Sequence, residues 1–430
     1  MSQNKQSLNI ITIAAMMLLY AMIAFVTNLA APVGKIWESS FAGSSNASIL
    51  GMLGNMMNFL AYLIMGIPAG KILAKVGYKK TALAAIAIGF AGVLIQWLSG
   101  ITDSFAVYLA GAFVGGFCVC MLNTVTNPML NLLGGGGNKG NQLNLIGGTV
   151  NSLSAALTPM FVGALIGTSL TGKTIADVNV VLYIAMAVFA LVFVVLAVMP
   201  LAEPQRADSN TVYERSPWAF RHFVLGTIAI FVYVGVEIGV PATLISYLSN
   251  EQYGAGFSFE TAGFVAGLYW LMMLVGRLIG SLIGNKVSSK TMVTCVSSVA
   301  IVLMLLAIFA GDSMSVLMPV NWSFEMAQLP IAACLIVICG LCTSVMWGCI
   351  FNMSVEGLGK YTAAASGIFM MMVAGGGIVP LIQSAVADRF AVAGGSGYLI
   401  SYIIPLICVA YILFYALVGS KNVNKDIPTA

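Results

Sequence analysis

Long apolar runs alternate with short polar segments along most of this chain. A helix needs about 20 mostly apolar residues to cross the hydrocarbon core of a bilayer, and runs of that length recur twelve times. The pattern therefore predicts an all-α membrane protein with twelve transmembrane helices. The predicted spans cover residues 10–34, 48–69, 82–101, 105–133, 141–167, 180–199, 221–248, 260–284, 291–311, 331–353, 362–383 and 396–419.

The longest predicted cytoplasmic segment lies between the sixth and seventh spans. The segment from Pro200 to Arg221 concentrates charged side chains of both signs. We therefore predict an N-terminal six-helix bundle over residues 1–199, a cytoplasmic linker over 200–220 and a C-terminal six-helix bundle over 221–430.

Repeated motifs relate the two predicted bundles. Gly66-x-x-x-Gly70 at the end of span two recurs as Gly276-x-x-x-Gly280 in span eight, at an offset of 210 residues, and Lys290 follows Lys80 at the same offset. Small residues four apart mark close helix packing, and their recurrence in matching spans predicts two pseudo-symmetric halves. A transporter built this way holds its site between the halves, near the membrane midplane.

Lysine and arginine positions predict the orientation, because cytoplasmic loops are enriched in both residues. With the N-terminus inside, 14 of the 18 fall in cytoplasmic segments. Lys35, Lys173 and Arg389 fall outside, and Arg277 lies within span eight. Only an even number of spans preserves this asymmetry, so both termini are predicted to lie in the cytoplasm.

Composition excludes several classes of protein. Only 7% of the residues are charged, against about 25% in soluble domains, and a net charge of +4 is too small to suggest nucleic-acid binding. One histidine and cysteines buried in apolar runs predict no metal and no cofactor. The segments Gly134–Gly137 and Gly70-Lys71 do not match the phosphate-binding P-loop. We predict a transporter rather than an enzyme, powered by a gradient.

Glu237 is the only acidic residue deep inside a predicted span. Ionisable groups are costly in a membrane and are therefore functional candidates. Glu237 is predicted to serve as a proton or cation site, or as an acceptor for substrate hydroxyls; a neutral glutamic acid bonded to a neighbouring helix is the structural alternative. Arg277 is the only deep cation, and we expect it to pair with an acid or with helix-end carbonyls at a gate.

Side-chain amides supply most of the other polar groups inside the spans. An amide both donates and accepts hydrogen bonds, which suits an uncharged ligand with many hydroxyls. Interhelical hydrogen bonding is the structural alternative for each of them. The candidate substrate-binding residues, with Glu237, are Asn28 in span one, Asn123 and Asn127 in span four, and Asn144 and Asn151 in span five.

Several segments resemble known transporter sequences. The segment after span two resembles the loop motif of the major facilitator superfamily; the candidate gating or loop-motif residues are Gly70, Gly77, Lys79 and Lys80, with Arg277. Four others, Leu122–Pro128, Gln142–Leu145, Phe231–Glu237 and Gly375–Pro380, resemble the fucose–galactose–glucose:proton symporter family. The likeness spans nearly the whole chain.

This resemblance implies the major facilitator fold and sugar uptake by alternating access in a bacterial cytoplasmic (inner) membrane. The proton-linked acids of the family match Asn28 and Asn123 here. An amide cannot titrate, so coupling either passes through Glu237 or is absent.

Other functions stay open at this point. A uniporter, a sodium-coupled carrier of a sugar or related metabolite, and a multidrug or metabolite exporter all fit the twelve-span pattern. We expect a sugar as substrate, H⁺ or Na⁺ as a possible coupling ion, the lipid bilayer as the surroundings and a monomer as the oligomeric state.

Overall fold

The computed structural model describes residues 3–40, 47–135, 137–166, 179–201, 215–249, 254–310, 313–392, 397–424 and 427–428. Most of the predicted linker and the predicted outer residue Lys173 lie outside these ranges. The chain forms two compact units, and each is described by itself. The first comprises Met1–Pro217, Leu358–Ala374 and Pro428–Ala430, and the second Trp218–Gly357 and Gly375–Ile427.

These units resemble the predicted bundles except in two stretches of chain, residues 358–374 and the C-terminal Pro428–Ala430. Residues 358–374 belong to predicted span eleven, yet they pack with the first unit. The bundle limits read from the sequence, 1–199 and 221–430, stay a prediction.

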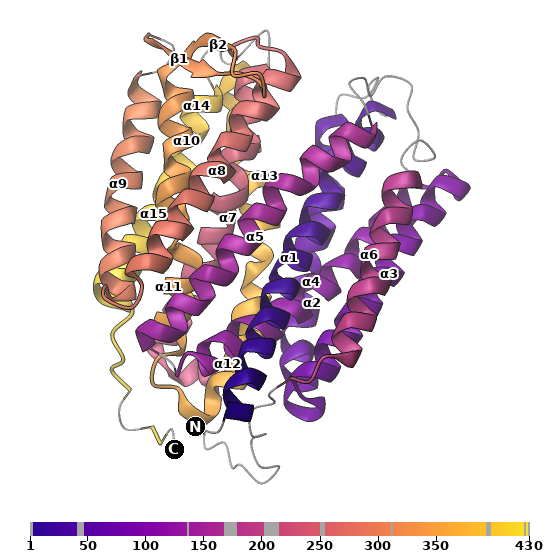
Figure 1. Ribbon diagram of the computed structural model, residues 1–430. Coiled ribbons are helices and arrows are strands. Elements are labelled where there is room, and N and C mark those ends of the chain that lie inside the picture. The colour runs from indigo at the N-terminus through magenta and orange to yellow at the C-terminus, as the bar shows by residue number, and fades with distance from the viewer. Residues whose placement is uncertain are drawn as a thin grey trace. The chain divides into compact units, whose positions relative to one another are not determined.

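The first unit is built around α4, which contacts α1, α2, α3, α5 and α12 (Figure 1). Most of the second half of α4, from Cys118 to Leu130, is buried. The added segment begins with α12, which packs along α2. The helices of this unit are α1 (Gln3–Ser40), α2 (Ala47–Val76), α3 (Tyr78–Thr102), α4 (Phe105–Leu133), α5 (Gly137–Ile166), α6 (Asn179–Val198) and α12 (Thr362–Met371), followed by the short helix η4 (Met372–Ala374).

The second unit packs its other helices against α7 and α9 (Figure 1). Its helices are α7 (Arg221–Ser249), α8 (Phe259–Ile283), α9 (Ser289–Ala310), α10 (Ile331–Thr343), α11 (Met346–Val355), α13 (Gly375–Val392), α14 (Gly397–Ser401) and α15 (Ile403–Phe414). Short helices η2 (Pro217–Ala219), η3 (Gly359–Tyr361) and η5 (Tyr415–Gly419) complete the chain, η3 belonging to the first unit and η2 spanning the boundary.

Three of the predicted spans are interrupted helices. Span ten divides into α10 and α11 at Ser344–Val345, and span eleven divides into α12, η4 and α13. Span twelve comprises α14, α15 and the π-helical η5. Each interruption removes backbone hydrogen bonds from the regular helical pattern, so nearby carbonyls become available to other donors.

Close backbone contacts hold α7 and α13 together. Phe231, Gly235 and Gly239 lie one turn apart on α7 and meet residues 375, 379 and 383 of α13 in the same order. The helices therefore run parallel. A Cβ at Gly375 would collide with the Phe231 carbonyl. Only glycine permits this approach, as in other small-residue helix seams.

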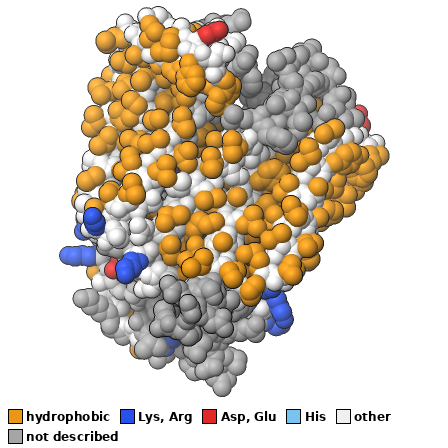
Figure 2. Space-filling model, viewed as in Figure 1, with side chains coloured by type: hydrophobic (Ala, Val, Ile, Leu, Met, Phe, Trp, Pro, Cys, Tyr) orange, Lys and Arg blue, Asp and Glu red, His pale blue; other side chains and the backbone are white. Residues whose placement is uncertain are grey.

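The exterior of both units is suited to lipid. Eleven helical stretches among the described residues are long and apolar enough to cross a membrane. The remaining predicted span corresponds to α5, a 30-residue helix that is less apolar than most of the others because its described part is rich in amides and glycines. On the face of each unit shown in Figure 2, hydrophobic side chains cover the middle of the helices, while lysines and arginines gather toward one end. The chain is a multi-pass membrane protein.

In the described part of the chain, a β-hairpin is the element that the all-α prediction does not include. Strands β1 (Ser315–Pro319) and β2 (Met326–Pro330) pair antiparallel between α9 and α10. Figure 1 shows the hairpin at the end of the second unit, over the ends of its helices.

Candidate functional site

A cluster of amides and tyrosines lies inside the first unit. The Tyr20 hydroxyl of α1 donates to Asn127 Oδ1 of α4 at 2.7 Å and lies 3.4 Å from Asn144 Oδ1 of α5. One phenol therefore joins three helices. Asn127 and Asn144 are almost fully buried, so their hydrogen bonds form in surroundings of low dielectric constant.

Asn123 extends this cluster by one turn along α4. Its Nδ2 donates to the Tyr62 hydroxyl of α2 at 3.0 Å and to the Val119 carbonyl at 3.2 Å. Asn127 Nδ2 in turn donates to the Asn123 carbonyl at 2.9 Å and lies 3.3 Å from Asn123 Oδ1. We call Tyr20, Tyr62, Asn123, Asn127 and Asn144 the amide–tyrosine cluster.

One donor in the amide–tyrosine cluster has no partner. Asn144 Nδ2 is buried and makes no hydrogen bond with the described residues. An unsatisfied buried donor is costly, by about 1–3 kcal/mol. Such a donor is expected where a ligand or a water molecule completes the bonding.

Two other candidate amides bond to main-chain carbonyls rather than to the side chains of this cluster. Asn28 Nδ2 donates to the Ala24 carbonyl of its own helix at 2.8 Å. Asn151, two turns after Asn144 on α5, donates from Nδ2 to the Tyr20 carbonyl at 3.0 Å. The Nδ2 groups of both residues are thus bonded to main-chain carbonyls. Substrate binding by Asn28 and Asn151 stays a prediction.

Sequence reasoning missed Tyr20 and Tyr62. Each is the lone tyrosine of its predicted span, which is a weak signal because aromatic residues also serve as packing and interface anchors. Their part in the cluster depends on which helices lie next to α4, and a single sequence does not reveal that.

The second unit contains an ion pair inside the membrane-spanning region. Arg277 Nη2 of α8 donates to Glu237 Oε1 of α7 at 3.0 Å, and the two side chains are only 7% and 13% exposed. Tyr233 lies one turn before Glu237 on α7, and its buried hydroxyl has no hydrogen-bond partner among the described residues. The pair carries no net charge, which lowers its cost in a membrane.

Arg277 also binds the interruption of span ten. Its Nε donates to the Ser344 carbonyl at 3.2 Å, at the point where α10 ends and its carbonyls lose their helical donors. Arg277 is therefore paired both with an acid and with a helix-end carbonyl. It links α7, α8 and the α10–α11 break.

A proline follows each of two candidate residues at the same spacing. Asn28 precedes Pro32 in α1, and Glu237 precedes Pro241 in α7. Proline lacks the N–H that would bond to the carbonyl four residues earlier, so the Asn28 and Glu237 carbonyls are both released from regular helical bonding. The two positions stand 209 residues apart in the first spans of the two halves, close to the offset of the repeated glycine motif.

The candidate loop-motif residues have structural contacts within the first unit. Gly77, with φ of 87°, ends α2 and begins α3, a backbone conformation that favours glycine. Gly70 lies against Gly367 of α12. Lys79 Nζ donates to the Ala197 and Met199 carbonyls at the end of α6, both at 2.8 Å, whereas Lys80 is exposed.

Lys290 of the second unit makes the equivalent contact. Its Nζ donates to the Leu417 carbonyl of η5 at 3.0 Å, near the end of span twelve. The structural counterpart of Lys290 is thus Lys79 rather than Lys80, one residue away from the match read from the sequence.

Substituting Lys79 with methionine is expected to lower stability modestly. A cation at a helix C-terminus contributes about 0.3–1 kcal/mol, and Lys79→Met removes that cation while keeping the length of the side chain. Thermal unfolding in detergent should show a lower midpoint for Lys79→Met and an unchanged one for Lys80→Met. Equal losses of stability in both variants would mean that the hydrogen bonds from Lys79 to the α6 carbonyls do not stabilise the protein.

Comparisons with known proteins agree with this architecture. Residues 13–381 match the family described as "Major Facilitator Superfamily". A glucose/galactose transporter of Brucella abortus is 31% identical over 371 residues, covering 85% of this chain and 84% of the relative. The L-fucose-proton symporter of Escherichia coli K12 is 23% identical over 397 residues, covering 85% and 84%.

A solved structure shows the same fold. The crystal structure of the Major Facilitator Superfamily transporter FucP in the outward conformation matches with a TM-score of 0.75 at 20% identity, covering 96% of this chain and all of that one. The family resemblance and fold class predicted from the sequence are confirmed, and a family of transporters agrees with the prediction that the chain is not an enzyme. This chain belongs to the Major Facilitator Superfamily.

Proposed function

We propose that this protein is a secondary transporter that carries a monosaccharide across a bacterial cytoplasmic membrane by alternating access. The amide–tyrosine cluster is the observation that carries the proposal. Its described members are neutral and offer both hydrogen-bond donors and acceptors. They therefore suit the hydroxyls of a sugar better than a charged or apolar ligand. Relatives named as glucose/galactose transporters and L-fucose-proton symporters support this substrate class.

In this proposal, the unpaired Asn144 Nδ2 donates to a sugar hydroxyl. Asn127 is held by the Tyr20 hydroxyl and Asn123 by its bond to the Tyr62 hydroxyl, and the Tyr20 hydroxyl lies 3.4 Å from Asn144 Oδ1. Because these groups are bonded to one another before the ligand arrives, little side-chain freedom is lost on binding. The polar groups thereby select ligands whose hydroxyls fit them.

We propose Glu237 as the coupling residue. The positions matching the family's acids are Asn28 and Asn123, and Glu237 is the carboxylate found deep in a described span. Proton uptake by Glu237 would cancel its charge and weaken its bond to Arg277, while the Ser344 carbonyl would still hold Arg277. Protonation would thus change how α7 is tied to α8 and to the α10–α11 break.

A uniporter is the second candidate, and one observation favours it. Arg277 already neutralises Glu237, so the pair can stay charged throughout the transport cycle without taking up a proton. The proposal also includes a cytoplasmic location for both termini and a monomer as the transporting unit, with Na⁺ as the alternative coupling ion. An exporter fits less well because the cluster is polar.

Uptake of radiolabelled glucose, galactose and fucose into proteoliposomes tests this function. With an inward proton gradient, we expect accumulation above the external concentration, and a protonophore should abolish it. If the sugar only equilibrates across the membrane, and neither a proton gradient nor a sodium gradient changes this, the protein is a uniporter. Absence of flux for all three sugars would contradict the substrate class.

Glu237→Gln separates coupling from binding. Glutamine keeps an acceptor for Arg277 Nη2 but cannot take up a proton, so the variant should lose gradient-driven accumulation while retaining sugar counterflow. Both assays use the same proteoliposomes, which makes each the control for the other. Accumulation at the native level in Glu237→Gln would exclude Glu237 as the coupling residue.

A further inference from the structure

The hairpin between α9 and α10 has a hydrogen-bonded turn that exposes two aromatic rings. The Val320 N–H donates to the Glu325 carbonyl at 2.9 Å, closing the turn. Within it, Asn321 Oδ1 accepts from the Ser323 and Glu325 N–H groups, both at 3.1 Å, and Asn321 Nδ2 donates to Glu325 Oε2 at 2.7 Å. Trp322 and Phe324 between these anchors are 66% and 72% exposed.

Phe324 has a backbone conformation that is unusual for its type. Its φ is 56°, in the left-handed region that glycine and asparagine occupy at much lower cost than a bulky aromatic residue. Asparagine or glycine would suit the turn better, so folding of the turn does not account for a phenylalanine at this position. Strain of this kind often marks a residue retained for a function of its side chain.

The strands add further apolar surface on the side facing away from the unit. Met318 and Leu329 are buried beneath the hairpin, whereas Met314, Leu317 and Met326 are more than half exposed. Between Ser313 and Pro330 the sequence contains one charged residue, Glu325, and neither lysine nor arginine. A segment outside the spans would ordinarily carry more charge if water alone surrounded it.

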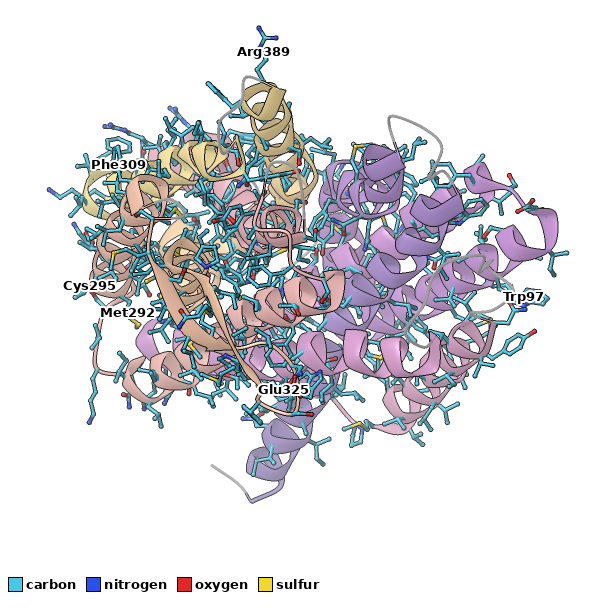
Figure 3. All side chains as sticks on the ribbon, turned by 90° about the horizontal axis from the view of Figure 1, so that it is seen from above. Trp97, Met292, Cys295, Phe309, Glu325 and Arg389 are labelled. Atoms are coloured by element: carbon cyan, nitrogen blue, oxygen red, sulfur yellow. The ribbon has the colours of Figure 1, made fainter. Side chains whose placement is uncertain are left out.

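The helix before the hairpin has an exposed apolar face of the kind that contacts lipid. Val299, Val302, Leu306 and Phe309 lie on one side of α9 and are 50–82% exposed, as expected for a face in the bilayer. Phe309 stands at the end of α9, five residues before Met314. At the other end of the hairpin, the Trp322 ring packs edge-on against Phe264 of α8, with centroids 5.2 Å apart. In Figure 3, which looks onto this end of the unit, Glu325 marks the turn and Phe309 the end of α9.

We propose that the turn of this hairpin inserts Trp322 and Phe324 into the headgroup region of the bilayer, as an interfacial anchor for the adjoining ends of α8, α9 and α10. In this proposal, phospholipid covers the exposed apolar side chains of the hairpin. Tryptophan favours this depth because its ring is apolar and its N–H is polar. The absence of cationic side chains in the hairpin sequence predicts that anchoring does not require anionic lipid.

Fluorescence quenching in nanodiscs that each hold one copy of the full chain tests the anchor. The Trp322 emission is obtained by subtracting the spectrum of Trp322→Phe, a variant that keeps an aromatic ring against Phe264. We expect phospholipids brominated near the glycerol end of their chains to quench this emission more than lipids brominated near the chain end. Quenching should be equal in neutral and anionic nanodiscs, and aqueous acrylamide should have little effect.

Phe324→Asn supplies a variant that separates anchoring from folding. Asparagine suits the left-handed backbone, so the thermal midpoint in detergent should not fall. Loss of the second aromatic ring should nevertheless reduce the lipid quenching of Trp322 by about twofold or more. Native-level quenching in this variant would remove Phe324 from the anchor.

Two outcomes would overturn the proposal. Trp322 emission that responds to acrylamide but not to brominated lipid would place the turn in water. Shielding from both quenchers in crowded proteoliposomes, with exposure to acrylamide in single-copy nanodiscs, would instead identify a second copy of the chain as the occupant.

Discussion

Arg277→Met is expected to destabilise the protein by about 3–5 kcal/mol, the usual cost of removing one partner from a buried ion pair. The substitution keeps an unbranched apolar stem but leaves the Glu237 carboxylate without its cation and the Ser344 carbonyl without its Nε donor. Reversible unfolding in mixed micelles measures this loss. Sugar uptake should fall with it, because α7, α8 and the α10–α11 break share this single side chain.

The double variant Glu237→Gln with Arg277→Met distinguishes charge pairing from simple loss of contacts. It removes both charges and leaves no uncompensated ion, so it should recover part of the stability that Arg277→Met loses. The hydrogen bond from Nε is absent from both variants, which makes the comparison specific for the charge. Identical stabilities of the two variants would show that the unpaired Glu237 charge does not destabilise Arg277→Met.

Asn144→Ala is expected to weaken sugar binding by about tenfold or more, because one hydrogen bond to a buried donor corresponds to about 1–3 kcal/mol. Its Nδ2 is the unpaired donor in the amide–tyrosine cluster, so a ligand can use it without breaking a bond within the protein. Equilibrium binding of labelled sugar to purified protein measures the dissociation constant directly, and the Michaelis constant for uptake should rise in parallel.

Asn151→Ala is the matched control on the same helix face. The two asparagines lie two turns apart on α5, but Asn151 Nδ2 already donates to the Tyr20 carbonyl. Its loss should lower stability by weakening the packing of α1 on α5, with affinity changed by less than about threefold on the same energy scale. A larger loss of affinity in Asn151→Ala than in Asn144→Ala would move the binding site along α5.

Hydrophobic patterning was sufficient to locate the spans because each of them must be long and apolar to cross a bilayer. The predicted and observed limits coincide for α4, at residues 105–133. Other helices are longer than predicted; α1 and α2 reach Ser40 and Val76. Helical hydrogen bonding continues into polar flanks that an apolar pattern does not register.

Interruptions within the spans were harder to predict. The Ser344–Val345 break has neither glycine nor proline at the break itself, and Arg277, distant in sequence, binds its carbonyl. The hairpin strands are five residues each, too short to be recognised beside helices of more than 20 residues. Both features depend on contacts between segments rather than on local preference.

The sequence singled out polar residues inside the spans but not all of their partners. Amides and a carboxylate stand out in apolar runs because they are costly there, which identified Asn123, Asn127, Asn144 and Glu237 as candidates. The sequence did not reveal that tyrosines join the amides. Their roles in binding and coupling stay predictions for the experiments above.

The contribution of Leu358–Ala374 to the first unit bears on how this protein can be divided. The polypeptide passes from one unit to the other after Pro217, Gly357, Ala374 and Ile427. A cut in the linker would leave the first fragment without the segment that packs along α2, and would leave that segment attached to the second fragment. No single cleavage site yields two self-sufficient pieces, so the halves of this molecule are repeats in sequence but not independent modules for exchange between transporters.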